Sequence, residues 1–267
     1  MATNDTYEIL ALKYGTHQNR TRVDNFLFAD DHASHSPIDY FVWVIRNQDR
    51  SMLVDTGFDY AEAKLRGRTL SQEPREVLKL IGIDAEKIDT VIVSHLHYDH
   101  AGTLDHFPAA RFHIQDAEVA YATGRCMCEP FIRRPFTADH VCSLIKKVYQ
   151  GRVTFHDGEG EVAPGVTVHH APGHSRGLQC IRVKTAGGWV VLAADVAHLY
   201  ENMEKRQPFP IVDSVEATLR SYDKLYALAS SPAHIVPGHD PLVLKRYPAM
   251  EARTEGVVHR LDVSRKG

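Results

Sequence analysis

Short runs of β-branched and aromatic residues alternate with amphipathic helical patterns along the chain. Runs of this composition are typical of strands. The sequence predicts strands at Tyr40–Arg46, Ser51–Val54, Thr90–Ser94, Arg111–Ile114, Val166–His170, Cys180–Lys184 and Trp189–Ala194. The first run, YFVWVIR, is apolar at most of its positions, which indicates a strand buried on both faces.

Apolar residues spaced three and four positions apart predict helices between these strands. The helical ranges are Pro74–Ile81, Thr137–Tyr149 and Ser214–Ser230. We expect Gly82 to end the first helix in a left-handed conformation. We expect Asp213 to cap the third, with Glu216 at the capping-box position. The interleaved pattern predicts an α/β or α+β sandwich with helices outside the sheets, and residues 1–267 are expected to form a single domain.

Composition and charge narrow the function classes. The chain is 43% hydrophobic and 24% charged, as in ordinary globular proteins, and its net charge is −3. A slightly acidic protein gives no electrostatic reason to expect nucleic acid or an acidic membrane surface as partner. The first residues do not resemble a signal peptide. The longest apolar run, around Trp189–Ala194, is far shorter than the roughly 20 residues that span a bilayer. We therefore expect a cytoplasmic protein that binds neither nucleic acid nor membrane.

The four cysteines are expected to be reduced thiols, because nothing indicates a secreted disulfide framework. Cys126 and Cys128 have a CxC spacing that could form half of a metal site. A second nearby Cys/His pair is missing from the sequence around them, so ordinary thiols are the favoured interpretation.

Histidine is unexpectedly frequent, with 17 copies against 13 prolines and 11 tyrosines. Four potential metal ligands, His95, His97, Asp99 and His100, directly follow an apolar strand-like run. In an extended chain, residues i and i+2 point the same way, so His95 and His97 can bind one ion. The other two lie in the following turn and can aim at a second ion. Imidazole with carboxylate suits zinc, although manganese or iron can occupy such sites. A His-rich surface loop is the alternative.

Three further ligand-type residues stand at the ends of later strand-like runs: His174, Asp195 and His239. Each alone could be a turn residue. Together with the first cluster, they strengthen the prediction of a two-metal centre.

These motifs resemble those of the metallo-β-lactamase-fold hydrolases. HLHYDH at residues 95–100 matches their HxHxDH signature, and the resemblance extends from about Tyr40 to His239. The VDTG segment that ends at Gly57, the APGHS segment around His174 and the late PGHD segment also match. Within the superfamily, the chain is most similar to the N-acyl-homoserine-lactone lactonases. The resemblance implies a four-layer αββα sandwich and a quorum-quenching hydrolase.

The resemblance also implies a ligand set. The first divalent ion would be bound by His95, His97 and His174. The second would be bound by Asp99, His100 and His239, with Asp195 bridging both. Asp55 occupies the position of a carboxylate that orients a ligand imidazole, although it could instead be a simple turn residue.

Such a centre would open a lactone ring by attack of a metal-bridging hydroxide, and Asp99 would transfer a proton to the leaving alkoxide. The resembling lactonases carry a tyrosine three residues after the bridging aspartate, where this chain has His198. We expect His198 to donate a hydrogen bond to the substrate carbonyl, with Tyr200 as a less suitable substitute. Alternatively, His198 merely lines the pocket.

Several segments are candidates for the walls of the substrate cleft. Cys126–Phe136 either covers the cleft or packs its phenylalanines inward. Leu104–Phe107 and Met203–Phe209 could supply apolar walls, whereas Asp30–His35 is more typical of a solvated loop.

The sequence leaves other substrates open. Another ester, an aryl lactone or a thioester, as in the glyoxalase II enzymes, is the main alternative. A nuclease is disfavoured by the net acidic charge. A di-iron redox protein is disfavoured because its relatives usually have a carboxylate where this chain has His97. The small-molecule substrate is expected to be bound by a monomer or a homodimer.

Overall fold

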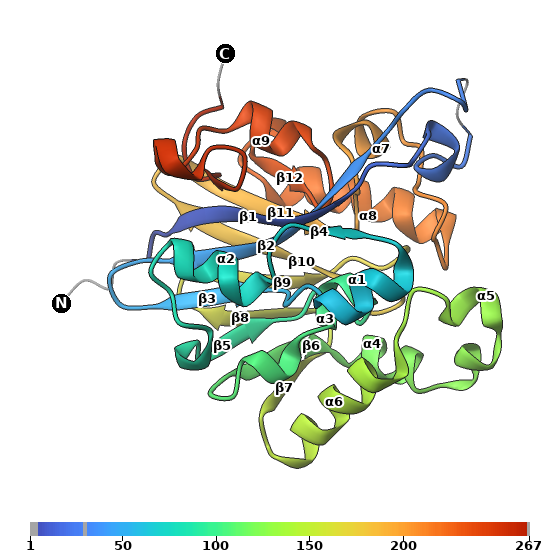
Figure 1. Cartoon of the computed structure of the whole chain (residues 1–267), viewed down its shortest axis with the longest axis horizontal. Coiled ribbons are helices and arrows are strands. Elements are labelled where there is room, and N and C mark those ends of the chain that lie inside the picture. The colour runs from blue at the N-terminus through green and yellow to red at the C-terminus, as the bar shows by residue number, and fades with distance from the viewer. Residues whose placement is uncertain (1–4, 29–30, 266–267) are drawn as a thin grey trace.

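The strands of the computed structural model, which describes residues 5–28 and 31–265, are distributed over two sheets (Figure 1). The strand bounds are β1 Glu8–His17, β2 Ile38–Arg46, β3 Ser51–Val54, β4 Thr69–Leu70, β5 Thr90–Ile92, β6 Arg111–Gln115, β7 Val153–His156, β8 Glu159–Ala163, β9 Val166–His170, β10 Gln179–Thr185, β11 Gly188–Ala194, β12 Ile235–Pro237 and β13 Val258–Arg260. The first sheet has the order β13-β1-β2-β3-β5-β6-β7, with β4 paired to β1. The second has the order β12-β11-β10-β9-β8.

Helices occupy most of the connections. Their bounds are α1 Tyr60–Arg66, α2 Pro74–Leu80, α3 Tyr98–Ala101, α4 Asp116–Ala122, α5 Pro130–Arg133, α6 Ala138–Tyr149, α7 Tyr200–Glu204, α8 Val215–Leu228 and α9 Leu242–Arg246. Short 3-10 helices are η1 Arg22–Asp24, η2 Ala85–Lys87, η3 Leu104–His106, η4 Arg125–Cys128, η5 Pro232–His234 and η6 Ala252–Thr254. Within the described residues, no helix is long and apolar enough to cross a bilayer.

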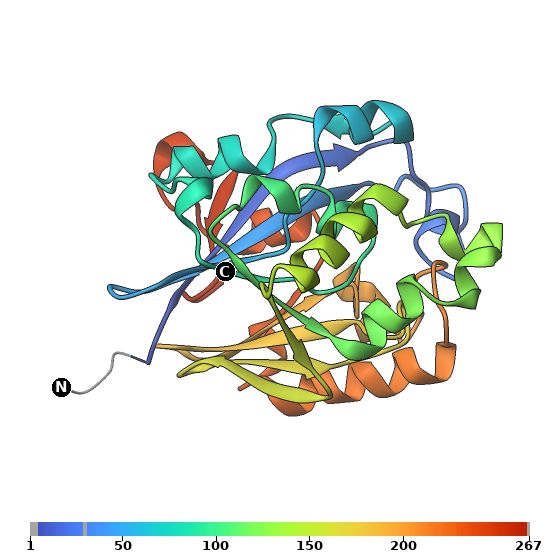
Figure 2. The same ribbon diagram turned by 90° about the horizontal axis from the view of Figure 1, so that it is seen from below.

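The two sheets pack face to face, with helices on the outer face of each (Figure 2). In this view α1 and α2 lie above the first sheet, and α8 lies below the second. The layers therefore run helix, sheet, sheet, helix. The expected four-layer αββα sandwich is confirmed.

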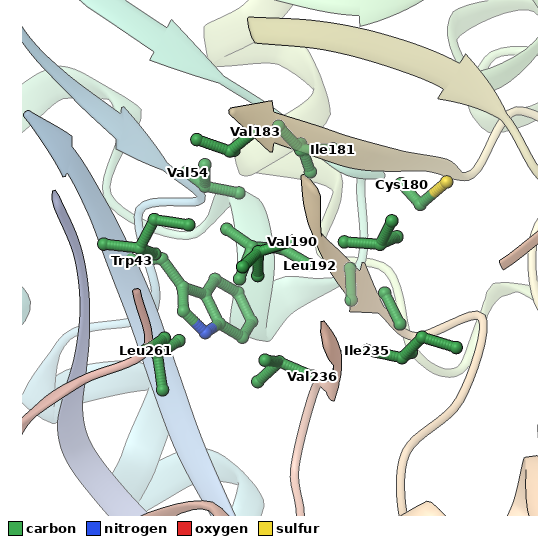
Figure 3. Packing of buried hydrophobic residues seen from close by; sticks show 14 of the residues in the cluster. Trp43, Val54, Cys180, Ile181, Val183, Val190, Leu192, Ile235, Val236 and Leu261 are labelled. Carbon is green, nitrogen blue, oxygen red and sulfur yellow. The ribbon is translucent and has the colours of Figure 1, made fainter. Parts of the chain in front are cut away.

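Strand β2 shows why the sheets stack. Its alternate side chains Phe41 and Trp43 belong to the core between the sheets, and Val42 and Val44 to the core beneath the outer helices. Successive side chains of a strand point to opposite faces, so a strand with two apolar faces requires a layer on each side. Trp43 lies among residues of both sheets (Figure 3). The predicted burial of both faces is confirmed.

The predicted strands and helices all occur, with ends that shift by at most two residues. Gly82 has a φ of +75°, as expected after α2. The predicted cap of α8 is wrong. Ser214 is the N-cap and accepts a hydrogen bond from Ala217 N at 3.2 Å. Asp213 lies one residue before the N-cap, and its carboxylate pairs with Arg176 at 3.1 Å. This shift of one position also removes Glu216 from the capping-box position.

Candidate metal centre

The predicted ligands meet where strands of both sheets end. His95 and His97 follow β5, Asp195 directly follows β11, and His239 follows β12. His174 lies in the loop between β9 and β10. Parallel pairing of β11 with β12 places the carboxyl ends of these two strands together. The fold therefore brings segments more than 140 residues apart to one edge of the sandwich.

Asp195 lies at the centre of the cluster. Its Oδ1 is 2.9 Å from His239 Nε2 and 3.1 Å from His100 Nε2. Its Oδ2 is 3.2 Å from His174 Nε2 and 3.8 Å from His95 Nε2. One carboxylate thus faces ligands of both predicted sets, which is the position required of a bridging residue.

The remaining ligands complete two neighbouring groups. His97 Nδ1 is 2.9 Å from His174 Nε2, and Asp99 Oδ2 is 3.8 Å from the Nε2 atoms of both His100 and His239. Potential ligand atoms lie within 4.8 Å of one another in three groups: His95, His97, His174 and Asp195; Asp99, His100 and His239; and Asp195, His198 and His239. The first two groups have the same members as the ligand sets implied by the sequence resemblance, and the third adds His198.

The chemistry of these residues fits divalent ions. His95 Nε2, His100 Nε2 and Asp195 Oδ1 are buried atoms that make no hydrogen bond of acceptable geometry with any described residue. Buried polar atoms without a partner are costly unless a metal ion or another ligand satisfies them. Nitrogen and carboxylate donors at such spacing are typical of zinc sites.

Asp55 orients two of the imidazoles. His100 Nδ1 donates to Asp55 Oδ2 at 2.7 Å, which leaves Nε2 facing the centre. Ser94 Oγ donates to the same carboxylate at 2.8 Å and lies 3.0 Å from His95 Nδ1. Asp55 also has a left-handed φ of +60°, a strained conformation for a non-glycine residue. Its carboxylate therefore orients the ring of His100 directly and the ring of His95 through Ser94, which a simple turn residue would not do.

Backbone carbonyls hold two other rings. His174 Nδ1 donates to Ile211 O at 2.6 Å, and His239 Nδ1 donates to Asp39 O at 2.8 Å. In each case the hydrogen bond selects the tautomer with an unprotonated Nε2, the form that binds a metal.

Burial and mutual charge set the protonation of the cluster. Burial, reinforced by neighbouring imidazoles, lowers the pKa of His95 and His97 well below the usual range. For His100 and His239, burial is outweighed by nearby carboxylates, chiefly Asp195, and the pKa is raised. The same histidines outweigh burial at Asp195 and hold its pKa low. An ionised carboxylate surrounded by histidines is a strong donor set for cations.

Glu118 connects the loop that carries His95 and His97 with the loop that carries His174. The sequence patterns did not indicate this role. This fully buried residue of α4 accepts hydrogen bonds from Leu96 N and Gly177 N, each at 2.9 Å, and from Ser175 Oγ. Leu96 lies between His95 and His97, and Ser175 follows His174. Burial raises the pKa of Glu118, while these donors oppose that shift. A Cβ on Gly177 would lie 2.0 Å from Glu118 N, so glycine is required there.

Replacing Glu118 with glutamine is expected to weaken metal binding by about 10–100-fold, the usual cost of losing a residue that positions ligands. The amide replaces one carboxylate oxygen with an NH2 group, which faces either Leu96 N or the pair Ser175 Oγ and Gly177 N, so the side chain can no longer accept from all three donors. Titration against a chelating dye measures the affinity. Glu129→Gln, at an exposed position, serves as the control. An unchanged metal affinity in Glu118→Gln would show that the two loops keep their positions without the Glu118 carboxylate.

His198 lies inside the site and Tyr200 does not. His198 Nε2 is 2.9 Å from Asp195 Oδ2, and the ring stacks on Phe209 with centroids 3.6 Å apart. Tyr200 is buried outside the cavities beside the metal ligands, with the Arg246 guanidinium over its ring. His198 is thus the candidate for contact with substrate.

Two adjoining cavities open beside the centre. The larger, of about 210 Å³, is mainly apolar and is lined by His97, Tyr121, Phe131, Ile132, Arg134, Pro135, Phe136, His174, Pro210, Ile211, Val212 and Asp213. The smaller, of about 80 Å³, reaches Asp99, Asp195, His198 and His239. They share His97, Arg134, Pro135, His174 and Ile211, so they form one groove across the metal ligands.

The groove tests the predicted walls. Within the segment Cys126–Phe136, α5 and the residues after it line the groove, whereas η4 does not (α5 is labelled in Figure 1). Phe131 is 76% exposed, and Phe136 packs partly against the core, so each alternative holds for one phenylalanine. Leu104–Phe107 is wrong as a wall, because Leu104 and Phe107 belong to the core beneath the helices. Within Met203–Phe209, Phe209 lines the groove, whereas Met203 lies in the core.

Other predicted segments lie apart from the groove. Residues 31–35 are largely exposed, as expected of a solvated loop, and Asp30 lies outside the described residues. Cys126 and Cys128 are free thiols, and neither belongs to a metal-binding group within the described part of the chain. The interpretation of these cysteines as ordinary thiols fits this arrangement.

A two-sheet αββα fold with a buried His/Asp centre at one edge defines a metal-dependent hydrolase of the metallo-β-lactamase class. The family model described as the metallo-beta-lactamase superfamily matches residues 37–253. The chain belongs to this superfamily, and the predicted family is confirmed.

Named relatives narrow the class further. An N-acyl homoserine lactonase of Bacillus cereus is 31% identical over 218 residues, covering 74% of this chain and 81% of the relative. One from a Bacillus species is 30% identical over 221 residues, covering 76% and 82%. The chain is therefore a hydrolase similar to the N-acyl homoserine lactonases.

Solved structures confirm the fold. An N-acyl homoserine lactone hydrolase with the product N-hexanoyl-L-homoserine at its catalytic metal center matches with a TM-score of 0.76 at 21% identity, covering 92% of this chain and 98% of that one. A dizinc quorum-quenching lactonase matches with a TM-score of 0.71 at 14% identity, covering 97% and 95%.

Proposed function

We propose that this protein opens the ring of a small lactone, an N-acyl homoserine lactone or a related compound, with two divalent ions bound. The observation that carries the proposal is the sharing of Asp195 by two ligand groups beside an apolar cavity. The relatives named N-acyl homoserine lactonase support the substrate class, and the dizinc neighbour supports zinc, although manganese or iron suits the same donors.

His95, His97 and His174 would hold one ion, and Asp99, His100 and His239 the other, with Asp195 shared. Two divalent ions in such a site supply a nucleophilic water at neutral pH and polarise the substrate carbonyl. The lactone then becomes a hydroxy acid, with water as the only co-reactant.

Asp99 is the residue suited to move the proton. It lines the groove, and no hydrogen bond to its carboxylate occurs within the described residues. Its Oδ2 atom would take up a proton as the ring opens and return it to the leaving oxygen. His198, on the other side of Asp195, would donate from its ring N–H to the substrate carbonyl. The apolar cavity would exclude water from the acyl chain and hold the ring over the ligands.

A substrate panel assayed by pH-stat, with metal content measured on the same batch, tests this proposal. We expect acyl-homoserine lactones to be opened faster than γ-butyrolactone, aryl acetates or S-lactoylglutathione, by a protein carrying about two ions per chain. Faster turnover of the aryl esters or the thioester would identify an esterase or a glyoxalase II-like enzyme instead. Less than one ion per chain with no turnover would exclude the metal-dependent mechanism.

A further inference from the structure

The groove across the metal ligands has two chemically different ends. The end beside His97 and His174 is apolar, with Phe131, Ile132 and Phe136 in its wall. The other end, the smaller cavity, is lined by Arg20, Arg66 and Arg68 together with Tyr40 and Tyr98, whereas Arg134 lines both cavities. An uncharged acyl lactone would occupy the apolar end of the groove. Its binding does not explain why arginines line the other end.

Strand pairing brings two of these arginines together. In the β1–β4 pair, Thr16 lies opposite Thr69, so the residues just beyond them, His17 and Arg68, are neighbours. Arg68 Nη1 is 3.3 Å from His17 Nε2, and Arg20 Nη1 is 3.4 Å from His17 Nδ1. Two guanidinium groups thus flank one imidazole at the arginine end of the groove.

This arrangement leaves donor hydrogens unsatisfied, although Arg20 also donates through Nε to Asn25 Oδ1 at 2.8 Å and through Nη2 to Asp24 O. A neutral imidazole has one acceptor nitrogen, so it can accept from only one of the two guanidinium groups. Arg68 donates through Nε to Tyr98 Oη at 3.2 Å and through Nη1 to Arg66 O at 2.8 Å. Its Nη2 makes no hydrogen bond with any described residue. Donors that lack an acceptor at a cavity wall are suited to bind an oxyanion.

The positive charges of Arg20 and Arg68 are offset only by carboxylates beyond salt-bridge distance, Asp24 for Arg20 and Asp99 for Arg68. Within the described part of the chain, neither Arg20 nor Arg68 forms a salt bridge, whereas Arg66 is paired with Glu62. Asp99 lines the same cavity, but its carboxylate belongs to the metal-ligand set. Burial, followed by the charges of Arg68 and Arg20, lowers the pKa of His17 to about 4. His17 is therefore uncharged at neutral pH and leaves the net charge of this end of the groove unchanged.

We propose that Arg20 and Arg68 form an anion-binding subsite, and that the preferred substrates are lactones or esters carrying a carboxylate. The carboxylate would accept from Arg68 Nη2 and from the Arg20 guanidinium while the scissile carbonyl lies over the metal ligands. This subsite rests on the proposed hydrolytic function and specifies its substrate class. Arginine suits the role because its planar fork matches a carboxylate.

A matched pair of lactones tests the subsite: γ-butyrolactone and γ-butyrolactone-γ-carboxylate, which differ only in the charged group. We expect the wild-type enzyme to prefer the carboxylate by at least about tenfold in kcat/KM. Arg68→Gln should lower kcat/KM for the carboxylate at least about tenfold more than for the neutral lactone. Arg68→Lys, which keeps the charge, should retain part of the preference. Arg111→Gln, outside both cavities, is the control and should change neither value. No wild-type preference, or equal losses on both lactones, would overturn the subsite.

A binding measurement separates failure of the subsite from failure of the lactonase function. Calorimetric titration of the metal-loaded protein with glutarate and with butyrate compares ligands with and without a second carboxylate. We expect glutarate to bind at least about tenfold more tightly, and Arg20→Gln or Arg68→Gln to abolish the difference. Equal binding of the two acids to wild type would contradict the subsite, whatever the protein hydrolyses. A glutarate preference without lactone turnover would retain the subsite and reject the lactonase function.

Discussion

Replacing Asp195 with asparagine is expected to lower kcat/KM for lactone hydrolysis by at least about 10³-fold and to reduce the bound ions from two per chain to one or fewer. Both carboxylate oxygens of Asp195 face imidazoles, at 2.9 Å from His239 and 3.2 Å from His174. Asparagine keeps the shape but removes the negative charge that two cations would share. Metal-ion catalysis supplies several kcal/mol of transition-state stabilisation, and each 1.36 kcal/mol is a factor of ten in rate.

A neighbouring buried aspartate provides the control. The Asp240 carboxylate accepts from Tyr200 N at 2.9 Å and Leu242 N at 2.8 Å and faces no metal ligand at ion-pair distance within the described residues. Asp240→Asn is expected to reduce the free energy of unfolding by about 1 kcal/mol while leaving the metal content at two ions. Metal analysis and steady-state kinetics on both variants distinguish a lost ligand from general destabilisation. Asp195→Asn with two ions and near-normal activity would remove Asp195 from the bridging position.

The residues of the candidate metal centre could be selected from the sequence because most of them lie shortly after a strand that the hydrophobic pattern reveals, whereas Asp99 and His100 lie in the short helix α3. Strand ends converge at sheet edges, so a ligand-type residue that directly follows a strand has a defined place in the fold. His95 and His97 also share a local spacing that aims both rings the same way. Asp55 was predictable for the same reason, since it follows β3 directly.

The supporting residues could not be predicted, because their partners are distant in sequence and their own surroundings look ordinary. Glu118 lies in a short helix with no special pattern, and its role depends on the hydrogen bonds that Leu96 and Gly177 donate to it. Arg20 and Arg68 are 48 positions apart and meet through the two-residue pairing of β4 with β1. Short strand pairs of this kind carry too little hydrophobic periodicity to be recognised.

The excess of histidines likewise has more than one physical origin. Some histidines outside the centre form buried hydrogen bonds with other protein groups. His113 Nδ1 lies 3.0 Å from His156 Nε2 between β6 and β7, and His259 Nδ1 donates to Tyr247 O at 2.7 Å. Burial is the main cause that lowers the pKa of His113, to about 4, so this pair is uncharged at neutral pH. The number of histidines alone cannot distinguish such structural histidines from candidate metal ligands. The position of a histidine relative to the end of a strand can distinguish them.

Replacing His198 with phenylalanine is expected to lower kcat/KM for lactones by about 10²-fold with two ions still bound. The substitution keeps an aromatic ring that can stack on Phe209, with centroids 3.6 Å apart, and removes both ring nitrogens, including Nε2 at 2.9 Å from Asp195 Oδ2. Loss of one hydrogen bond to a carbonyl oxygen that gains charge costs about 10²–10³-fold in rate. His198→Tyr, which installs the hydroxyl of the resembling lactonases, should recover part of the activity.

Metal analysis on the same variants separates the possible roles of His198. One of its ring nitrogens lies within 4.8 Å of the ligand atoms of Asp195 and His239, so it could also bind an ion. A drop to one ion per chain in His198→Phe would identify a metal ligand rather than a donor to substrate. Phe209→Leu removes the stacking but keeps the N–H, and we expect it to cost less than about tenfold. If Phe209→Leu and His198→Phe instead lose activity equally, ring placement rather than hydrogen bonding explains the role, and His198 only lines the groove.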